Sequence, residues 1–195
     1  VEKWTPVDHA AISFGHGVLV SPLQMVAAVN AIANGGELVE PRLVLEVRDP
    51  EGALLEQNRH PVKRRVISRR TAETVRGLMK SVVSADGTGE QAAVPGFVVA
   101  GKTGTTEVYD IKANGYSKTK HIASFVGFVP ADDPALTILV MIERPQKGRY
   151  GGVVAAPVFS RIARRALPAL GVWPAEGVRR VRMDLAARSL TSLPN

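Results

Sequence analysis

Residues 98–106 read VVAGKTGTT and bring a cation, several hydroxyls and a position without a side chain into one short stretch. A β-branched run that leads into polar residues is typical of a strand that carries those residues to the rim of a cleft. Lys102 would place a positive charge beside an anionic substrate group or a serine nucleophile. The hydroxyls of Thr103 and Thr105 can bind a carboxylate, and Gly104 leaves room for a substrate backbone against the strand.

Size and charge narrow the function classes. The 195 residues, of which 45% are hydrophobic, suffice for one sizeable core, so we expect one domain or most of one. The net charge is +7, and basic residues gather at 59–70 and 161–182. Such basic clusters are ordinarily exposed surface in contact with solvent. The alternative is that they bind an acidic partner or an anionic lipid surface. Because aromatic residues make up only 5% and no nucleic-acid module is recognisable, we expect no nucleic-acid partner.

The chain contains no cysteine, which excludes disulfides and thiolate zinc sites. The four histidines have no metal-ligand spacing, and we predict neither a metal nor another cofactor. No motif around these histidines supports a Ser-His-Asp triad. No signal peptide or membrane-spanning apolar run occurs. Because the chain begins at Val1 without a methionine, we expect it to be a piece of a longer protein whose targeting segment lies upstream.

Two predicted helices precede the Lys-Thr-Gly strand. Residues 1–20 are expected to form a loop that enters a glycine-rich turn. The first helix follows, because Ser21 and Gln24 form a capping box, Pro22 suits the first helical position and the glycines at 35–36 end the pattern.

Extended structure and a second helix come next. Residues 38–67 predict a small hairpin with a turn at 49–52. Ser68 caps the second helix, and residues 86–89 end it in a glycine-rich turn that lacks a P-loop lysine. The apolar stripe of this helix consists of Ala72, Val75, Leu78, Met79, Val82 and Val83.

Two strong strands and a last helix follow the Lys-Thr-Gly segment. A polar loop is expected over residues 107–120, and then antiparallel strands over 121–128 and 136–142. Residues 143–152 are expected to form a loop, and Pro157 begins the last helix. Its inward-facing residues are predicted to be Val158, Ile162, Ala166 and Leu170.

Short motifs in a fixed order resemble those of the class B (monofunctional) penicillin-binding proteins, and division-type peptidoglycan D,D-transpeptidases are the most similar group. The resemblance runs from about residue 14 to residue 170. The motifs are SFGHG at 13–17, VSPLQ at 20–24, NGG at 34–36, GTG at 87–89, AGKTGT at 100–105, HIASFVG at 121–127, YGG at 150–152 and APVF at 156–159.

The resemblance implies an α+β fold, in which an antiparallel sheet is flanked by helices and the Lys-Thr-Gly strand lies at its edge. Residues 1–171 would be the C-terminal part of a transpeptidase domain, incomplete without an upstream segment, and residues 172–195 a basic C-terminal tail. The implied reaction is attack by a serine on the penultimate D-alanine carbonyl of a stem peptide, release of D-alanine, and acyl transfer to an amine of a neighbouring strand. β-Lactams would acylate the same serine.

The resemblance also implies roles for single residues. Lys102 would supply positive potential and help with proton transfer. Thr103 and Thr105 would bind the terminal carboxylate, and the Thr105 N–H would complete the oxyanion hole. Gly104 would be permissive, and Thr106 would contact substrate.

The glycine-rich segment near the last helix is the remaining candidate. Tyr150, Gly151 and Gly152 would shape the wall of the substrate cleft beside the Lys-Thr-Gly strand. A plain turn is the alternative for these three residues.

The chain lacks the Ser-x-x-Lys and Ser-x-Asn motifs that the family needs before the Phe-Gly-His-Gly turn. We expect both on an upstream segment of the same protein, so the chain alone is predicted to be inactive. Residues 117–120 formally fit Ser-x-x-Lys. They lie in polar sequence without helical periodicity, whereas the chemistry needs serine and lysine on one face of a helix start.

Partners and location follow from the same resemblance. They would be peptidoglycan stem peptides, β-lactams, cell-division membrane proteins and a glycosyltransferase, on the periplasmic side of the cytoplasmic membrane behind an N-terminal anchor helix. Two alternatives remain open. One is a β-lactam sensor or β-lactamase-like hydrolase, which differs in how fast its acyl-enzyme hydrolyses. The other is a non-catalytic interaction module that uses the basic clusters.

Overall fold

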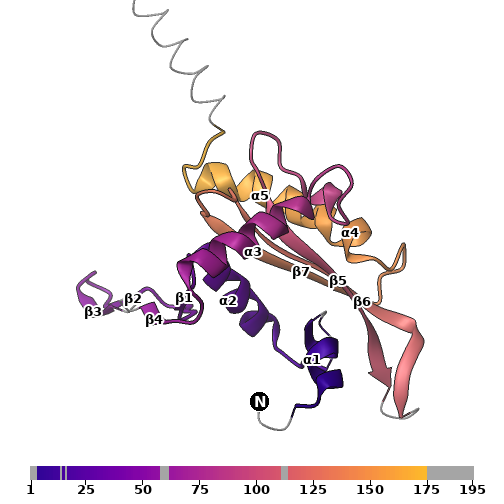
Figure 1. Ribbon diagram of the computed structural model, residues 1–195. Helices are drawn as coiled ribbons and strands as arrows, with labels where there is room; N and C mark the ends of the chain where they lie inside the picture. Colours follow the sequence, from indigo (N-terminus) through magenta and orange to yellow (C-terminus); the bar gives the residue numbers. More distant parts are fainter. Residues whose placement is uncertain (1–3, 14, 16, 58–61, 111–113, 175–195) are drawn as a thin grey trace, which may run out of the picture.

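The computed structural model describes residues 4–13, 15, 17–57, 62–110 and 114–174 (Figure 1). At its centre is an antiparallel sheet of three strands in the order β5-β6-β7. The strands are β5 (Ala100–Asp110), β6 (Gly115–Val129) and β7 (Leu136–Glu143). Helices pack on both faces, so the predicted α+β architecture with an antiparallel sheet is confirmed. The predicted basic tail beyond residue 174 lies outside the described residues.

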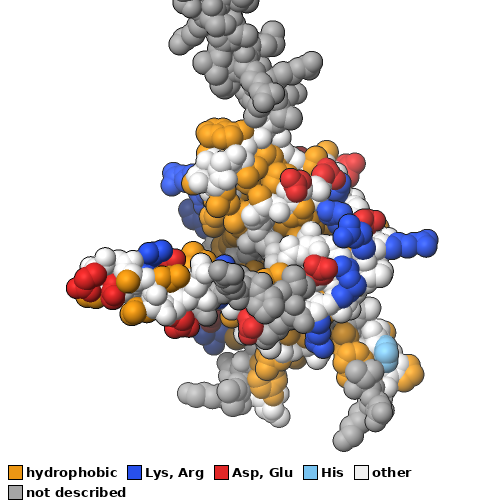
Figure 2. Space-filling view, turned by 90° about the vertical axis from the view of Figure 1, so that its left-hand side faces the viewer, with side chains coloured by type: hydrophobic (Ala, Val, Ile, Leu, Met, Phe, Trp, Pro, Cys, Tyr) orange, Lys and Arg blue, Asp and Glu red, His pale blue; other side chains and the backbone are white. Residues whose placement is uncertain are grey.

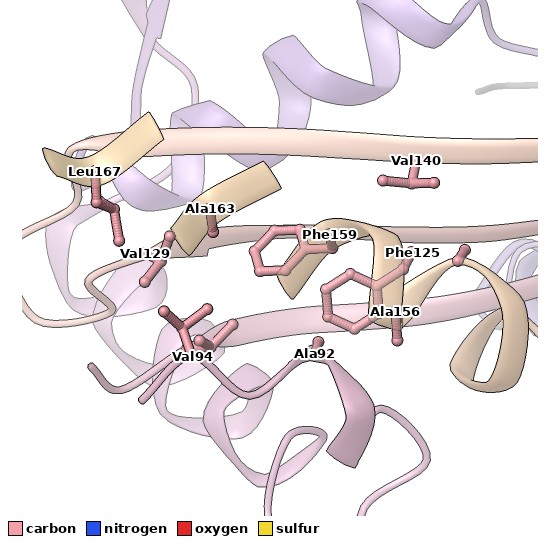
Figure 3. Close-up of a cluster of buried hydrophobic side chains, with 11 residues drawn as sticks. Ala92, Val94, Phe125, Val129, Val140, Ala156, Phe159, Ala163 and Leu167 are labelled. Carbon is pink, nitrogen blue, oxygen red and sulfur yellow. The ribbon is translucent and has the colours of Figure 1, made fainter. Parts of the chain in front are cut away.

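Two apolar cores enclose the sheet, because alternate residues of a strand point to opposite faces. On one face, Phe125 meets Phe159 of the last helix edge-on, with 4.9 Å between the ring centroids (Figure 3). On the other face, Phe128 packs with Val29 and Met79 from two earlier helices. Burial on both faces explains why the second half of strand β6, residues 122–129, reads as a nearly continuous apolar run.

Residues 6–13 form a helix, α1 (Pro6–Ser13), so the expected loop over residues 1–20 is wrong in this part. The N–H of Thr5 donates to the Asp8 carboxylate at 2.8 Å, and the N–H of Asp8 donates to the Thr5 hydroxyl at 3.2 Å. The Thr5 hydroxyl also donates to this carboxylate at 2.7 Å, and the bonds from the Thr5 N–H and hydroxyl hold the pKa of Asp8 below its usual value. The Thr-Pro-x-Asp pattern was the available sequence signal.

The next helix, α2 (Pro22–Ala33), has the predicted capping box. The Ser21 N–H donates to the Gln24 side chain at 2.8 Å, and the Gln24 N–H donates to the Ser21 hydroxyl at 3.3 Å. Beyond the helix, Gly36 has a φ of 97°, and a Cβ there would lie 2.1 Å from the carbonyl oxygen of Ile67. Only glycine therefore fits where the chain turns away from α2.

A small lobe of two-stranded sheets projects from the body (Figure 1). The predicted turn at residues 49–52 is confirmed, because Asp49 accepts a hydrogen bond from the Ala53 N–H at 2.7 Å. The strands pair antiparallel as β1 (Glu37–Val39) with β4 (Val62–Arg65) and β2 (Glu46–Arg48) with β3 (Leu54–Gln57).

Helix α3 (Arg69–Ser81) returns the chain to the sheet. Ser68 accepts a hydrogen bond from the Thr71 N–H at 3.0 Å, as a cap should. Of the predicted apolar stripe, Ala72 and Met79 are buried, whereas Leu78 is 66% exposed. The helix ends at Ser81, earlier than expected, and the predicted glycine-rich turn follows at residues 86–89. A single turn of 3₁₀ helix, η1 (Glu90–Ala92), then leads toward β5.

The two strands predicted after the Lys-Thr-Gly segment are confirmed as parts of β6 and β7, but the polar loop expected over residues 107–120 is wrong. Most of it belongs to a long hairpin whose end projects beyond the helices (Figure 1). The Tyr109 and Tyr116 rings meet across the hairpin with centroids 5.4 Å apart. Because Tyr109 and Tyr116 are 49% and 63% exposed at this end, its strands need no alternation of apolar residues, and the usual sequence signal is absent.

The C-terminal helices differ from prediction in two details. Gly151 and Gly152 lie in a short helix, α4 (Gly151–Val154), and not in a loop. Helix α5 (Ala156–Ala169) begins near Pro157 as expected, but Ile162 is 43% and Leu170 55% exposed. The helix has two overlapping apolar stripes, and the stripe that contains Phe159 packs against the sheet. The buried residues are Ala156, Phe159, Ser160, Ala163 and Leu167.

The basic clusters lie on exposed surface where the structure describes them. Arg65 is paired with Glu37 at 2.5 Å, and Arg161, Arg164 and Arg165 are exposed on α5. On the face in Figure 2, basic side chains lie among acidic and apolar ones. Among the helices that the structure describes, none combines the length and hydropathy needed to span a bilayer.

Candidate active site

The Lys-Thr-Gly residues lie on β5, which pairs with β6 alone among the strands that the structure describes. The expected position at the edge of the sheet is confirmed. Thr103 lies opposite Phe125 and shares its face with α4 and α5, whereas Lys102 lies opposite Val126 on the α2 and α3 side. Alternation along β5 thus separates the ammonium group from the two hydroxyls of Thr103 and Thr105.

The Lys102 side chain is exposed at this edge. Its Nζ atom donates a hydrogen bond to the carbonyl oxygen of Thr103 at 2.7 Å. An ammonium group has three donors, so two remain for a substrate group or a catalytic hydroxyl. Lys102 is therefore placed to act on a ligand that lies along β5.

The Thr103 hydroxyl contacts Thr88, which belongs to the GTG motif at residues 87–89 but was not among the predicted site residues. Its Oγ1 atom lies 3.0 Å from Oγ1 of Thr88, in the turn that follows α3. The turn was predicted, but its approach to β5 depends on tertiary packing between residues 15 positions apart. The available signal was the pair of glycines on either side of Thr88.

The Thr105 hydroxyl is engaged by α4. Its Oγ1 atom accepts a hydrogen bond from the N–H of Gly151 at 3.2 Å. A hydroxyl that accepts from a backbone N–H keeps its own proton for another acceptor. Thr105 can therefore donate to a carboxylate while α4 stays bonded to the strand.

The two glycines of the Tyr-Gly-Gly segment allow this close packing. A Cβ on Gly151 would lie 2.0 Å from the carbonyl oxygen of Ser124 and 2.5 Å from that of Gly104. A Cβ on Gly152 would lie 1.9 Å from the carbonyl oxygen of Thr88. Gly151 and Gly152 thus lie directly against the Lys-Thr-Gly strand and its neighbour.

The other predicted site residues lie farther from this cluster. Tyr150 is 55% exposed, and its hydroxyl accepts a hydrogen bond from Arg149 at 2.7 Å. Thr106 is exposed, with its hydroxyl 3.4 Å from the carbonyl oxygen of Glu107. Gly104 has a second reason to lack a side chain, since a Cβ there would lie 2.5 Å from Oγ of Ser124.

The Ser-x-x-Lys lookalike at residues 117–120 lies on strand β6 and not at the start of a helix. Ser117 Oγ accepts a hydrogen bond from the N–H of Lys120 at 3.1 Å. Residues three apart on a strand point to opposite faces, which does not suit a serine activated by its lysine. Over the part of the chain that the structure describes, no group of three or more metal-ligating side chains comes together.

A family model and individual related proteins assign the chain to the same family. Residues 1–164 match the family Transpeptidase, described as the penicillin binding protein transpeptidase domain. The chain is 45% identical over 177 residues to stage V sporulation protein D of Bacillus subtilis, covering 89% of this chain and 27% of that protein. It is 38% identical over 174 residues to the probable peptidoglycan D,D-transpeptidase PenA of Neisseria meningitidis, covering 88% of this chain and 28% of that protein.

The fold agrees with a solved structure. Penicillin-binding protein 3 of Mycobacterium tuberculosis, complexed with aztreonam, superposes with a TM-score of 0.77 at 33% identity. The match covers 88% of this chain and 40% of that chain. This chain therefore spans between about a quarter and two fifths of the length of these relatives.

Proposed function

This chain belongs to the penicillin-binding protein transpeptidase family, and we propose that it supplies one part of the active site of a division-type peptidoglycan D,D-transpeptidase. The observation that carries the proposal is the edge of β5. There Lys102, Thr103 and Thr105 stand within four residues, with the Gly151 N–H bonded to the last of them. The two hydroxyls on one face of this edge form a suitable site for the terminal carboxylate of a D-alanyl-D-alanine stem or of a β-lactam, and the Lys102 ammonium lies next along the strand on its other face.

In the proposed reaction, a serine Oγ attacks the penultimate D-alanine carbonyl, and the C–N bond to the last D-alanine breaks with transfer of a proton to the leaving amine. An amine of a neighbouring stem peptide then attacks the acyl-serine and restores the serine. The Thr105 N–H would stabilise the oxyanion together with the N–H of the serine. Lys102 would supply positive electrostatic potential at the site and help with the proton transfers.

We place the serine and its lysine, in a Ser-x-x-Lys motif, in the part of the whole protein upstream of Val1. The Ser-x-Asn motif would lie there too, and the chain by itself would be inactive. We also propose that the whole protein acts on the periplasmic side of the cytoplasmic membrane, behind an N-terminal anchor, with division proteins and a glycosyltransferase. Support comes from the names of the relatives, because peptidoglycan is made outside that membrane.

Labelling with a fluorescent penicillin tests the proposal. We expect the whole protein to be labelled on a serine upstream of Val1, and this chain alone to remain unlabelled. The measurement is gel fluorescence followed by peptide mapping, and the persistence of the label over time separates a transpeptidase or sensor from a rapid hydrolase. Label on Ser117 would overturn the assignment of the nucleophile. Absence of label from both proteins would overturn the acyl-enzyme mechanism.

A further inference from the structure

Both hydroxyls on the α4 and α5 side of β5 are bonded to a second element. Thr105 accepts from the Gly151 N–H at 3.2 Å, so the direction of that bond is fixed. Thr103 lies 3.0 Å from the Thr88 hydroxyl, and there either oxygen can donate. The direction of this second bond decides what Thr103 can offer to a ligand.

A threonine hydroxyl has one proton, and a carboxylate only accepts hydrogen bonds. Thr103 can therefore donate to a bound carboxylate only if it does not donate to Thr88. We propose that Thr88 is a positioning residue: its hydroxyl donates to Thr103 Oγ1, which turns the Thr103 proton toward the carboxylate of the ligand. This inference rests on the proposed function.

The position of Thr88 is fixed by its own turn. The Gly87 N–H donates to the Ser84 carbonyl at 2.9 Å, and the Gly89 N–H donates to the Val82 carbonyl at 2.8 Å. A Cβ on Gly89 would lie 2.8 Å from the Phe125 ring, so the turn lies close against the core of the sheet. The Thr88 hydroxyl is therefore brought to β5 by backbone packing.

The arrangement gives the two hydroxyls equivalent tasks. With a carboxylate bound, the Gly151 N–H donates to Thr105, Thr88 donates to Thr103, and both Thr103 and Thr105 donate to the ligand. Hydrogen bonds in such a chain strengthen one another, and bonds to a charged group are the stronger ones. Loss of the Thr88 hydroxyl should therefore weaken recognition of the carboxylate selectively.

The test compares acylation of the whole protein by benzylpenicillin and by its methyl ester, which lacks the charged carboxylate. We expect Thr88→Val to lower the second-order rate constant about tenfold for benzylpenicillin and less than about threefold for the ester. Thr88→Ser, which keeps the hydroxyl, should stay within about twofold of the wild type for both ligands. Thr74→Val, on the exposed side of α3, is the matched control and should change neither rate.

Each outcome has a distinct meaning. Equal losses for both ligands, or no loss for benzylpenicillin, would overturn the positioning role. Thr88→Ala is the second hydroxyl-free variant if Thr88→Val does not fold, and thermal unfolding of each variant identifies that case. Failure of the wild-type protein to react with benzylpenicillin would overturn the proposed function, and this inference with it. Normal wild-type acylation with an unselective Thr88→Val loss would overturn this inference alone.

Discussion

Replacement of Lys102 by methionine in the whole protein is expected to lower the second-order rate constant for acylation by benzylpenicillin by about 10²–10³-fold, the usual effect of removing one preorganised electrostatic group. Methionine keeps an unbranched stem of similar length and removes only the charge. Because Lys102 is exposed, the free energy of unfolding should change by less than about 0.5 kcal/mol. Stopped-flow acylation and thermal unfolding measure the two effects separately.

Lys80→Met is the matched control. It removes the same unit of charge from the end of α3, where Lys80 pairs with Asp132 and not with a residue of β5. A change in the general field of the protein would slow both variants alike, whereas a local role slows only Lys102→Met. Wild-type acylation by Lys102→Met would contradict the assignment of Lys102 and favour a non-catalytic module on this fold.

The two hydroxyls depend on three separate parts of the chain. Thr103 and Thr105 come from β5, Thr88 from the turn after α3, and Gly151 from the start of α4. Strand β5 alone would present hydroxyls that rotate freely. Thr88 in the turn and Gly151 in α4 hydrogen-bond to these hydroxyls before a ligand binds. Such preorganisation makes polar groups effective in a site.

Local signals in the sequence predicted most of the elements. The hydroxyl caps at Ser21 and Ser68 predicted two helix starts, and the apolar runs predicted β6 and β7. The predictions failed where the local sequence pattern and the packing between distant segments favour different arrangements. The inward face predicted for α5 holds for Val158 but is wrong for Ile162 and Leu170, because the helix carries two apolar stripes and the contact of Phe159 with Phe125 sets which one faces the sheet.

For the candidate site, the sequence motif predicts the residues and not their partners. The Lys-Thr-Gly-Thr pattern by itself identifies Lys102, Thr103 and Thr105. Thr88 lies 15 positions before Thr103, and Gly151 lies 46 positions after Thr105. Contacts of this kind depend on how the turn and α4 pack on the sheet, so no local pattern specifies them.

Replacement of Gly151 by alanine is expected to lower both stability and activity. The new Cβ would lie 2.0 Å from the Ser124 carbonyl oxygen and 2.5 Å from that of Gly104. Both are backbone atoms, so α4 must move away from the sheet. We expect about 1–3 kcal/mol lower free energy of unfolding, as for other overpacked sites. The movement also breaks the Gly151–Thr105 hydrogen bond and displaces β5, so acylation should fall by at least about 10²-fold.

Gly77→Ala is the matched control, because it makes the same chemical change where there is space. A Cβ on Gly77 meets no atom within 4 Å, and Gly77 lies within helix α3. Alanine there should raise the free energy of unfolding by about 0.5–1 kcal/mol and leave acylation unchanged. If Gly151→Ala instead kept wild-type stability and acylation, α4 would not pack on β5 as described. Loss of acylation with wild-type stability would mean that the Gly151–Thr105 contact serves the reaction and contributes little to folding.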